Sequence, residues 1–167
     1  FEDFEYFEKE KNVERFEEIK KKYNIINKDL WEKLEKDLIT RDELKVRRFK
    51  ELFKVANLSY NPEEFSSRYL ERLGEGVFLF DGAEDLCRYM KKKYKVAIVT
   101  NGIKEVQTSR IKNSGIAEYV DEIIISDELG ISKPHPGIFE YALKKLRHEN
   151  KNDVIMIGDS QTADIQG

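Results

Sequence analysis

Hydrophobic residues recur at helical spacing through residues 1–73, and no alternating pattern typical of a strand occurs there. Two successive stripes predict two helices. The first stripe consists of Phe4, Phe7, Val13, Phe16, Ile19 and Tyr23, and the second of Leu30, Trp31, Leu34 and Leu38. We expect these side chains to be core residues between packed helices, although Trp31 and Tyr69 are also able to stack on a nucleobase.

Two further helices in this half have recognisable start signals. Residues 40–43, Thr-Arg-Asp-Glu, have the spacing of a capping box, in which a hydroxyl and a carboxylate satisfy backbone N–H groups. Asn61 followed by Pro62 predicts another helix start, because proline suits the first helical position. Residues 1–75 are therefore predicted to form one domain, a bundle of four helices.

Beyond Gly74-Glu75-Gly76 the pattern changes to short apolar runs separated by stretches with helical spacing. The runs at 96–100, 123–125 and 154–157 are too short for helices and rich in β-branched residues, which favours buried strands. Strands joined by helices predict a parallel sheet with right-handed crossovers and helices on both faces. Residues 76–167 are therefore predicted to be an α/β domain with a three-layer, Rossmann-like parallel sheet.

Polar residues follow the carboxyl end of each predicted strand. They are Thr100, Asn101 and Gly102 after the first strand, Lys133 in the loop after the second, and Asp159 and Asp164 after the third. Because the carboxyl ends of parallel strands meet at one edge of a sheet, we expect these residues to converge there. A hydroxyl, exposed backbone amides, an ammonium and two carboxylates able to hold a hard cation are suited to a phosphoryl group.

Each of these signals also has a simpler interpretation. Thr100, Asp159 and Ser160 are of residue types that cap helices, and Lys133 before two prolines fits an exposed loop. The three signals in this order, each at the end of a strand, favour one shared site over three coincidences.

Three segments resemble motifs two, three and four of the haloacid dehalogenase-like (HAD) hydrolase superfamily. They are Val-Thr-Asn-Gly at 99–102, Ile-Ser-Lys-Pro-His-Pro-Gly-Ile-Phe at 131–139 and Ile-Gly-Asp-Ser-Gln-Thr-Ala-Asp at 157–164. The helical half resembles the α-helical cap of that superfamily. The chain as a whole is most similar to its pyrimidine 5′-nucleotidase-like phosphatases.

The resemblance implies a role for each motif residue. Thr100 would hydrogen-bond the phosphoryl group, with Asn101 and Gly102 beside it, and Lys133 would neutralise the nucleophile and the phosphate. Asp159 would bind Mg²⁺, and Asp164 would bind or orient the metal shell. The implied activity is Mg²⁺-dependent hydrolysis of a small phosphomonoester, foremost a nucleoside 5′-monophosphate, through an aspartyl-phosphate intermediate.

The chain departs from the family pattern because the first motif, Asp-x-Asp after an apolar strand, occurs nowhere in the 167 residues. Asp81 follows an apolar run, but Ala83 stands where the second aspartate belongs, so Asp81 is predicted to start a helix. We expect the nucleophile and a central strand to precede Phe1, and a further strand to follow Gly167. The 167 residues alone are expected to be inactive and unstable, with open strand edges.

Two other functions stay open at the level of the sequence. A metal-free 2-haloacid dehalogenase shares the fold, although the Gly-Asp-x-x-x-x-Asp pattern favours a metal-dependent enzyme. A chain without its nucleophile is also compatible with a non-catalytic binding module.

Composition narrows the expected partners and compartment. Charged residues make up 38% of the chain, but 30 basic and 33 acidic side chains leave a net charge of −3, which does not favour nucleic-acid binding. Cys87, the single cysteine, fits a reducing compartment, and no apolar run approaches 18 residues. We expect a cytoplasmic monomer or homodimer that acts on a small-molecule phosphate ester without membrane association.

Overall fold

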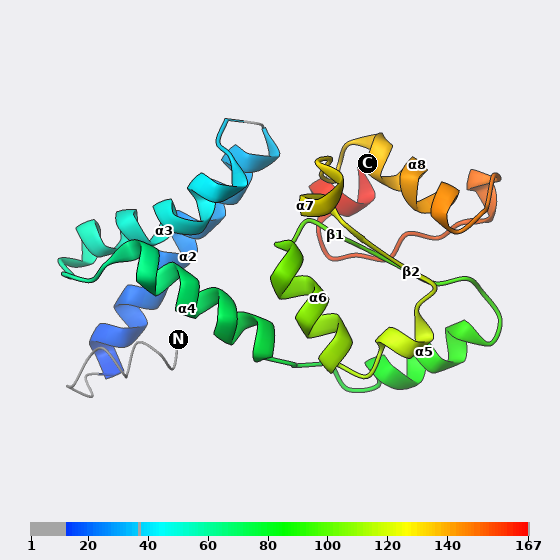
Figure 1. Cartoon of the computed structure of the whole chain (residues 1–167), viewed down its shortest axis with the longest axis horizontal. Helices are drawn as coiled ribbons and strands as arrows, with labels where there is room; N and C mark the ends of the chain where they lie inside the picture. Colours follow the sequence, from blue (N-terminus) through cyan, green and yellow to red (C-terminus); the bar gives the residue numbers. More distant parts are fainter. Residues whose placement is uncertain (1–12, 37, 167) are drawn as a thin grey trace. The chain divides into compact units, whose positions relative to one another are not determined.

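The computed structural model describes residues 13–36 and 38–166 (Figure 1). The chain divides between Arg72 and Leu73 into two compact units. Of the helices in the described ranges, none combines the length and apolar character needed to cross a bilayer. Phe4 and Phe7, predicted to belong to the first helix, lie outside the described residues.

The first unit contains a long helix, α2 (Val13–Glu35), followed by α3 (Arg41–Ala56) and the greater part of α4 (Pro62–Glu75). The prediction of two separate helices in the region of α2 was wrong, because members of both stripes, from Val13 to Leu34, lie on one continuous helix. The stretch 24–29 between the stripes contains neither glycine nor proline, so nothing in the backbone ends the helix there. Leu38 lies beyond the end of α2 and is exposed.

The predicted start signals of α3 and α4 are confirmed. The Thr40 hydroxyl accepts a hydrogen bond from the Glu43 N–H at 3.2 Å, and the Glu43 carboxylate accepts one from the Thr40 N–H at 2.8 Å. At α4, Pro62 is the first helical residue and the Asn61 side chain accepts from the Glu64 N–H at 2.8 Å. Caps of this kind contribute about 1 kcal/mol each, so the two loops specify where these helices begin.

Aromatic side chains form the main core of the first unit, as predicted. The Phe49 ring lies 4.9 Å from Phe65 and 5.1 Å from Tyr69, measured between centroids, and the Tyr23 hydroxyl donates to that of Tyr69 at 3.0 Å. Tyr69 packs against this cluster and Trp31 against a second, aliphatic one, so both are packing residues in this structure. Burial of each large apolar side chain stabilises the fold by about 1.5–3 kcal/mol.

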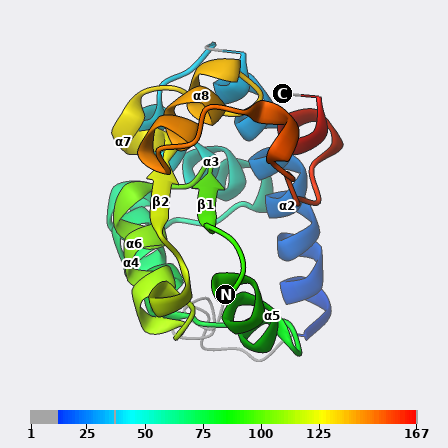
Figure 2. The ribbon, with the colours of Figure 1, turned by 90° about the vertical axis from the view of Figure 1, so that its right-hand side faces the viewer.

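The second unit has an α/β architecture, which confirms the predicted fold class. Its elements in chain order are α5 (Ala83–Lys91), β1 (Ala97–Thr100), α6 (Lys104–Asn113), β2 (Glu122–Ile125), α7 (Ser126–Leu129) and α8 (Pro136–Lys145). β1 and β2 are parallel neighbours, with Val99 opposite Ile124, and they run side by side in the same direction in Figure 2. α8 packs on one face of the pair, while α5 and α6 lie on its other side (Figure 1).

The start of α5 differs from the prediction in its chemistry. Gly82, with a φ of 78°, precedes the helix, and no side chain makes a capping hydrogen bond there. Asp81 therefore lies near the helix start, as predicted, but does not act as its cap. The left-handed backbone at position 82 suits glycine, which has no Cβ to clash.

The prediction of a third strand at 154–157 was wrong for this structure. Val154 to Gly158 form no strand, and Ile155 and Ile157 are 83% and 75% exposed. A strand exists through backbone hydrogen bonds to a neighbour, and within the described ranges β1 pairs only with β2. Without such a neighbour, three of the four apolar residues are exposed to solvent despite their high β-propensity.

Candidate active site

Asn101, the residue after β1, ties two loops together through its side chain. Its Oδ1 accepts a hydrogen bond from the Lys133 N–H at 2.7 Å, and its Nδ2 donates to the Lys133 carbonyl oxygen at 2.8 Å. One amide thus satisfies both backbone groups of a residue 32 positions away. The pair of bonds holds the loop that precedes α8 against the carboxyl end of β1.

Lys133 and Asp164 form a buried ion pair beneath this loop. The Lys133 Nζ lies 2.5 Å from the Asp164 Oδ1, and the two residues are only 9% and 6% exposed. The other carboxylate oxygen of Asp164 accepts from the Ser160 N–H at 3.0 Å. Removing either partner would leave an uncompensated buried charge, so the two side chains depend on each other.

The backbone before Asp164 is shaped around its carboxylate. A Cβ on Gly158 would overlap the carboxyl group of Asp164, so only glycine leaves room for it at this position. Asp164 itself belongs to a short π-helical turn, Gln161–Ile165, which follows Ser160. The Ser160 hydroxyl accepts from the Ala163 N–H at 3.0 Å and caps that turn.

Low pH should weaken the ion pair between Lys133 and Asp164. Burial raises the pKa of Asp164, but the hydrogen bonds from Lys133 and Ser160 outweigh it and place the pKa below its usual value of 3.8. A carboxyl group with a depressed pKa contributes stability above its unfolded pKa and loses it as pH falls through the folded pKa. The melting temperature should therefore fall more steeply below pH 3.8 in the parent than in Asp164→Asn; parallel curves for the two proteins would contradict this assignment.

Three of the predicted site residues are in direct contact in the structure, and Asp159 is not. Asn101, Lys133 and Asp164 are joined by direct contacts, and the half-buried Thr100 directly precedes Asn101. Asp159 is exposed and makes no hydrogen bond or ion pair with another residue of the described ranges. Asp159 directly precedes Ser160, whose N–H binds Asp164, so its backbone lies next to the turn that carries Asp164.

Two contributors were not predicted from the sequence. Gln107 donates from Nε2 to the Thr100 hydroxyl at 3.1 Å, and Gly158 makes room for the Asp164 carboxylate. The capping role considered for Ser160 is confirmed, since its hydroxyl caps the turn that carries Asp164. The Gln107 contact had no signal in the sequence, because a glutamine on a helix gives no indication of where its amide points.

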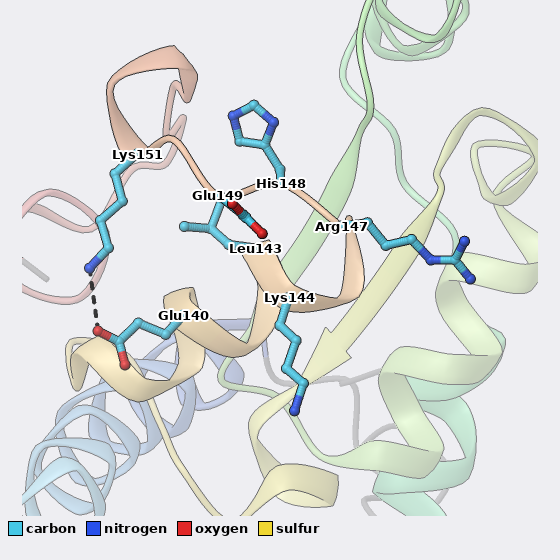
Figure 3. Close-up of a pocket in the computed structure, with 7 residues that line it drawn as sticks. All are labelled: Glu140, Leu143, Lys144, Arg147, His148, Glu149 and Lys151. Atoms are coloured by element: carbon cyan, nitrogen blue, oxygen red, sulfur yellow. Dashed lines mark hydrogen bonds and ion pairs between the residues drawn. The ribbon is translucent and has the colours of Figure 1, made fainter.

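A shallow pocket of about 460 Å³ lies elsewhere, at the carboxyl-terminal half of α8 and the loop after it (Figure 3). Its charged side chains diverge: in Figure 3 Arg147 points to the right, whereas Lys151 points downward to Glu140, with which it pairs at 3.3 Å. Polar groups that diverge do not enclose a ligand. The predicted residues whose side chains contact one another lie instead at the carboxyl end of β1 and in the loops that carry Lys133 and Asp164.

A cation at this junction would have few protein ligands among the described residues. Within the described residues no three histidine, cysteine or acidic side chains gather in a metal-binding group. Mg²⁺ keeps several waters and needs only one or two carboxylates beside a substrate phosphate. Of the two predicted metal ligands, Asp159 has an exposed carboxylate without a hydrogen bond to another described residue, whereas both oxygens of Asp164 already accept hydrogen bonds.

Comparison with known proteins places the chain in a family. The model of the haloacid dehalogenase-like hydrolases matches residues 2–167. The chain is 32% identical to the HAD-hydrolase YfnB of Bacillus subtilis over 95% of its length, and 34% identical to the pyrimidine 5′-nucleotidase PynA of Streptococcus pneumoniae over 95%. It is 30% identical to the pyrimidine 5′-nucleotidase YjjG of Escherichia coli over 87%. These matches span 67%, 68% and 64% of the three relatives.

Solved structures agree with this placement. A crystal structure of YfnB bound to magnesium superposes with a TM-score of 0.84 at 33% identity, over 89% of this chain and 67% of YfnB. A dehalogenase shares the fold with a TM-score of 0.62 at 20% identity, over 80% of this chain and 59% of that one. From the family match and these relatives, the chain belongs to the haloacid dehalogenase-like hydrolases.

Proposed function

We propose that the full-length protein hydrolyses a small phosphomonoester, foremost a pyrimidine nucleoside 5′-monophosphate. The observation that carries this proposal is that three separate loops meet at Lys133: Asn101 binds its backbone, and Asp164 binds its ammonium group. The names of PynA and YjjG, both pyrimidine 5′-nucleotidases, support the choice of substrate class.

In this proposal Lys133 supplies the positive charge at the phosphoryl group. Its ammonium has three N–H donors, and one of them is directed at Asp164 at 2.5 Å. The other two are available to oxygens of the phosphoryl group and of the attacking carboxylate. A cation held in a buried position without reorganisation stabilises developing negative charge more strongly than one in water.

The end of β1 would hold the phosphoryl oxygens. Thr100 would donate from its hydroxyl, and the backbone N–H groups of Asn101 and Gly102 would donate to the remaining phosphoryl oxygens. The Asn101 side chain is engaged on the Lys133 backbone, so its part in this proposal is to position the lysine loop.

Asp159 would hold Mg²⁺, and Asp164 would orient Lys133 instead of binding the metal. The magnesium in the YfnB structure supports the choice of cation. When bound, Mg²⁺ would neutralise charge on the phosphoryl oxygens. The 167 residues contain no Asp-x-Asp pair, so the proposal assigns the roles of nucleophile and general acid to none of them. Residues 1–75 would serve as the cap domain and 76–167 as the catalytic core.

A substrate panel tests the proposal. The full-length protein would be given pyrimidine and purine 5′-monophosphates, sugar phosphates and a 2-haloacid, each with Mg²⁺ or with EDTA. We expect phosphate release that requires Mg²⁺ and is fastest with pyrimidine nucleotides. Halide release unaffected by EDTA would instead identify a dehalogenase, and no turnover of any ester would refute the phosphatase.

A further inference from the structure

Gln107 on α6 reaches back to the end of β1. Its Nε2 lies 3.1 Å from the Thr100 Oγ1 in a partly buried hydrogen bond, and its own N–H donates to the Ile103 carbonyl within the helix. An amide nitrogen only donates, so the Thr100 oxygen is the acceptor in this bond. The hydroxyl proton must then point away from Gln107 and is available to another acceptor.

Gly102 leaves the space through which Gln107 makes this contact. A Cβ on residue 102 would overlap Gln107 Cγ and Nε2, so the glutamine side chain lies directly against the glycine backbone. Gly102 has no positive φ, which means that its small size, and not its backbone freedom, is what the structure uses. Thr100, Gly102 and Gln107 therefore form one packed unit.

We infer that Gln107 is a positioning residue, which holds the Thr100 hydroxyl as an acceptor on one side so that its proton is directed at a phosphoryl oxygen. This inference rests on the proposed function and assigns Gln107 no contact with substrate. A threonine hydroxyl without such a partner rotates among staggered positions and donates to water in most of them. The bond from Gln107 removes that freedom before the phosphate binds.

The same geometry explains why a glycine follows Asn101. Any larger residue at 102 would push the Gln107 amide away from Thr100 and release the hydroxyl. Gly102→Ala should therefore reproduce the effect of losing Gln107. It should also have little further effect once Gln107 has been shortened to alanine, because the clash is then absent.

A double-mutant cycle on the full-length protein tests the inference, with the dissociation constant of inorganic phosphate as the readout. Gln107→Leu keeps the approximate size of the side chain and removes its donor. It should weaken phosphate binding about 3- to 10-fold, the effect of one net hydrogen bond. In a Thr100→Val background the same substitution should have no further effect, because Gln107 acts only through the hydroxyl.

Asn113→Leu is the matched control, since it removes an exposed amide from the same helix without contact to Thr100. Melting temperatures of all variants exclude loss of folding as the cause. Equal weakening by Gln107→Leu with and without Thr100 would overturn the inference, as would parent-like binding in Gln107→Leu. A parent protein that binds no phosphate would instead refute the proposed function, so the two failures are distinguishable.

Discussion

Replacing Asp164 with alanine is expected to lower the free energy of unfolding by about 3–5 kcal/mol, because it leaves the Lys133 ammonium buried without its partner. The Ser160 N–H loses its acceptor in the same variant, which adds to the cost. Urea denaturation of the full-length protein measures the change. Catalytic activity should fall together with stability, since the ammonium would no longer be held in place.

Glu140→Ala provides the control for this experiment. Glu140 pairs with Lys151 at 3.3 Å, but both side chains are exposed, and such pairs contribute about 0–1 kcal/mol. Replacing both buried partners, in Lys133→Met with Asp164→Leu, should recover much of the stability lost in Asp164→Ala, because no unpaired charge remains. A loss in Asp164→Ala no larger than that in Glu140→Ala would show that the buried pair does not stabilise the fold.

Local sequence signals predicted the elements whose structure depends on a few neighbouring residues. The capping box at Thr40 and the proline at 62 mark real helix starts, since each acts within one turn of backbone. The runs at 97–100 and 122–125 are strands because each is the other's partner. These two strands also place Thr100 and the loop with Lys133 at one end of the sheet, which is why their proximity could be predicted.

Features that depend on distant partners were harder to predict. The run 154–157 has the composition of a strand, yet in the described part of the chain no neighbour is paired with it, so its β-branched residues remain exposed. Periodicity likewise shows which face of α2 is apolar, but not that two stripes share one helix. Side-chain contacts such as that of Asn101 with Lys133 arise only when the loops meet, 32 residues apart in sequence.

Replacing Asp159 should reduce turnover with little effect on stability, in contrast to replacing Asp164. Asp159→Asn is expected to reduce Mg²⁺-dependent phosphate release by about 10²–10³-fold, because an amide is a poor ligand for a hard cation and removes the charge that attracts it. Its free energy of unfolding should change by no more than about 0.5 kcal/mol, since the side chain is exposed and makes no contact with another described residue.

Steady-state turnover at several Mg²⁺ concentrations, measured together with urea denaturation, separates the two effects. Asp153→Asn is the matched control, an exposed carboxylate at the other end of the 154–158 segment that accepts a hydrogen bond from Asn150 at 2.8 Å. It should leave turnover unchanged. If Asp159→Asn retained the turnover and the Mg²⁺ dependence of the parent, the cation would have to bind elsewhere. The exposed carboxylate after the third apolar run would then have no catalytic role.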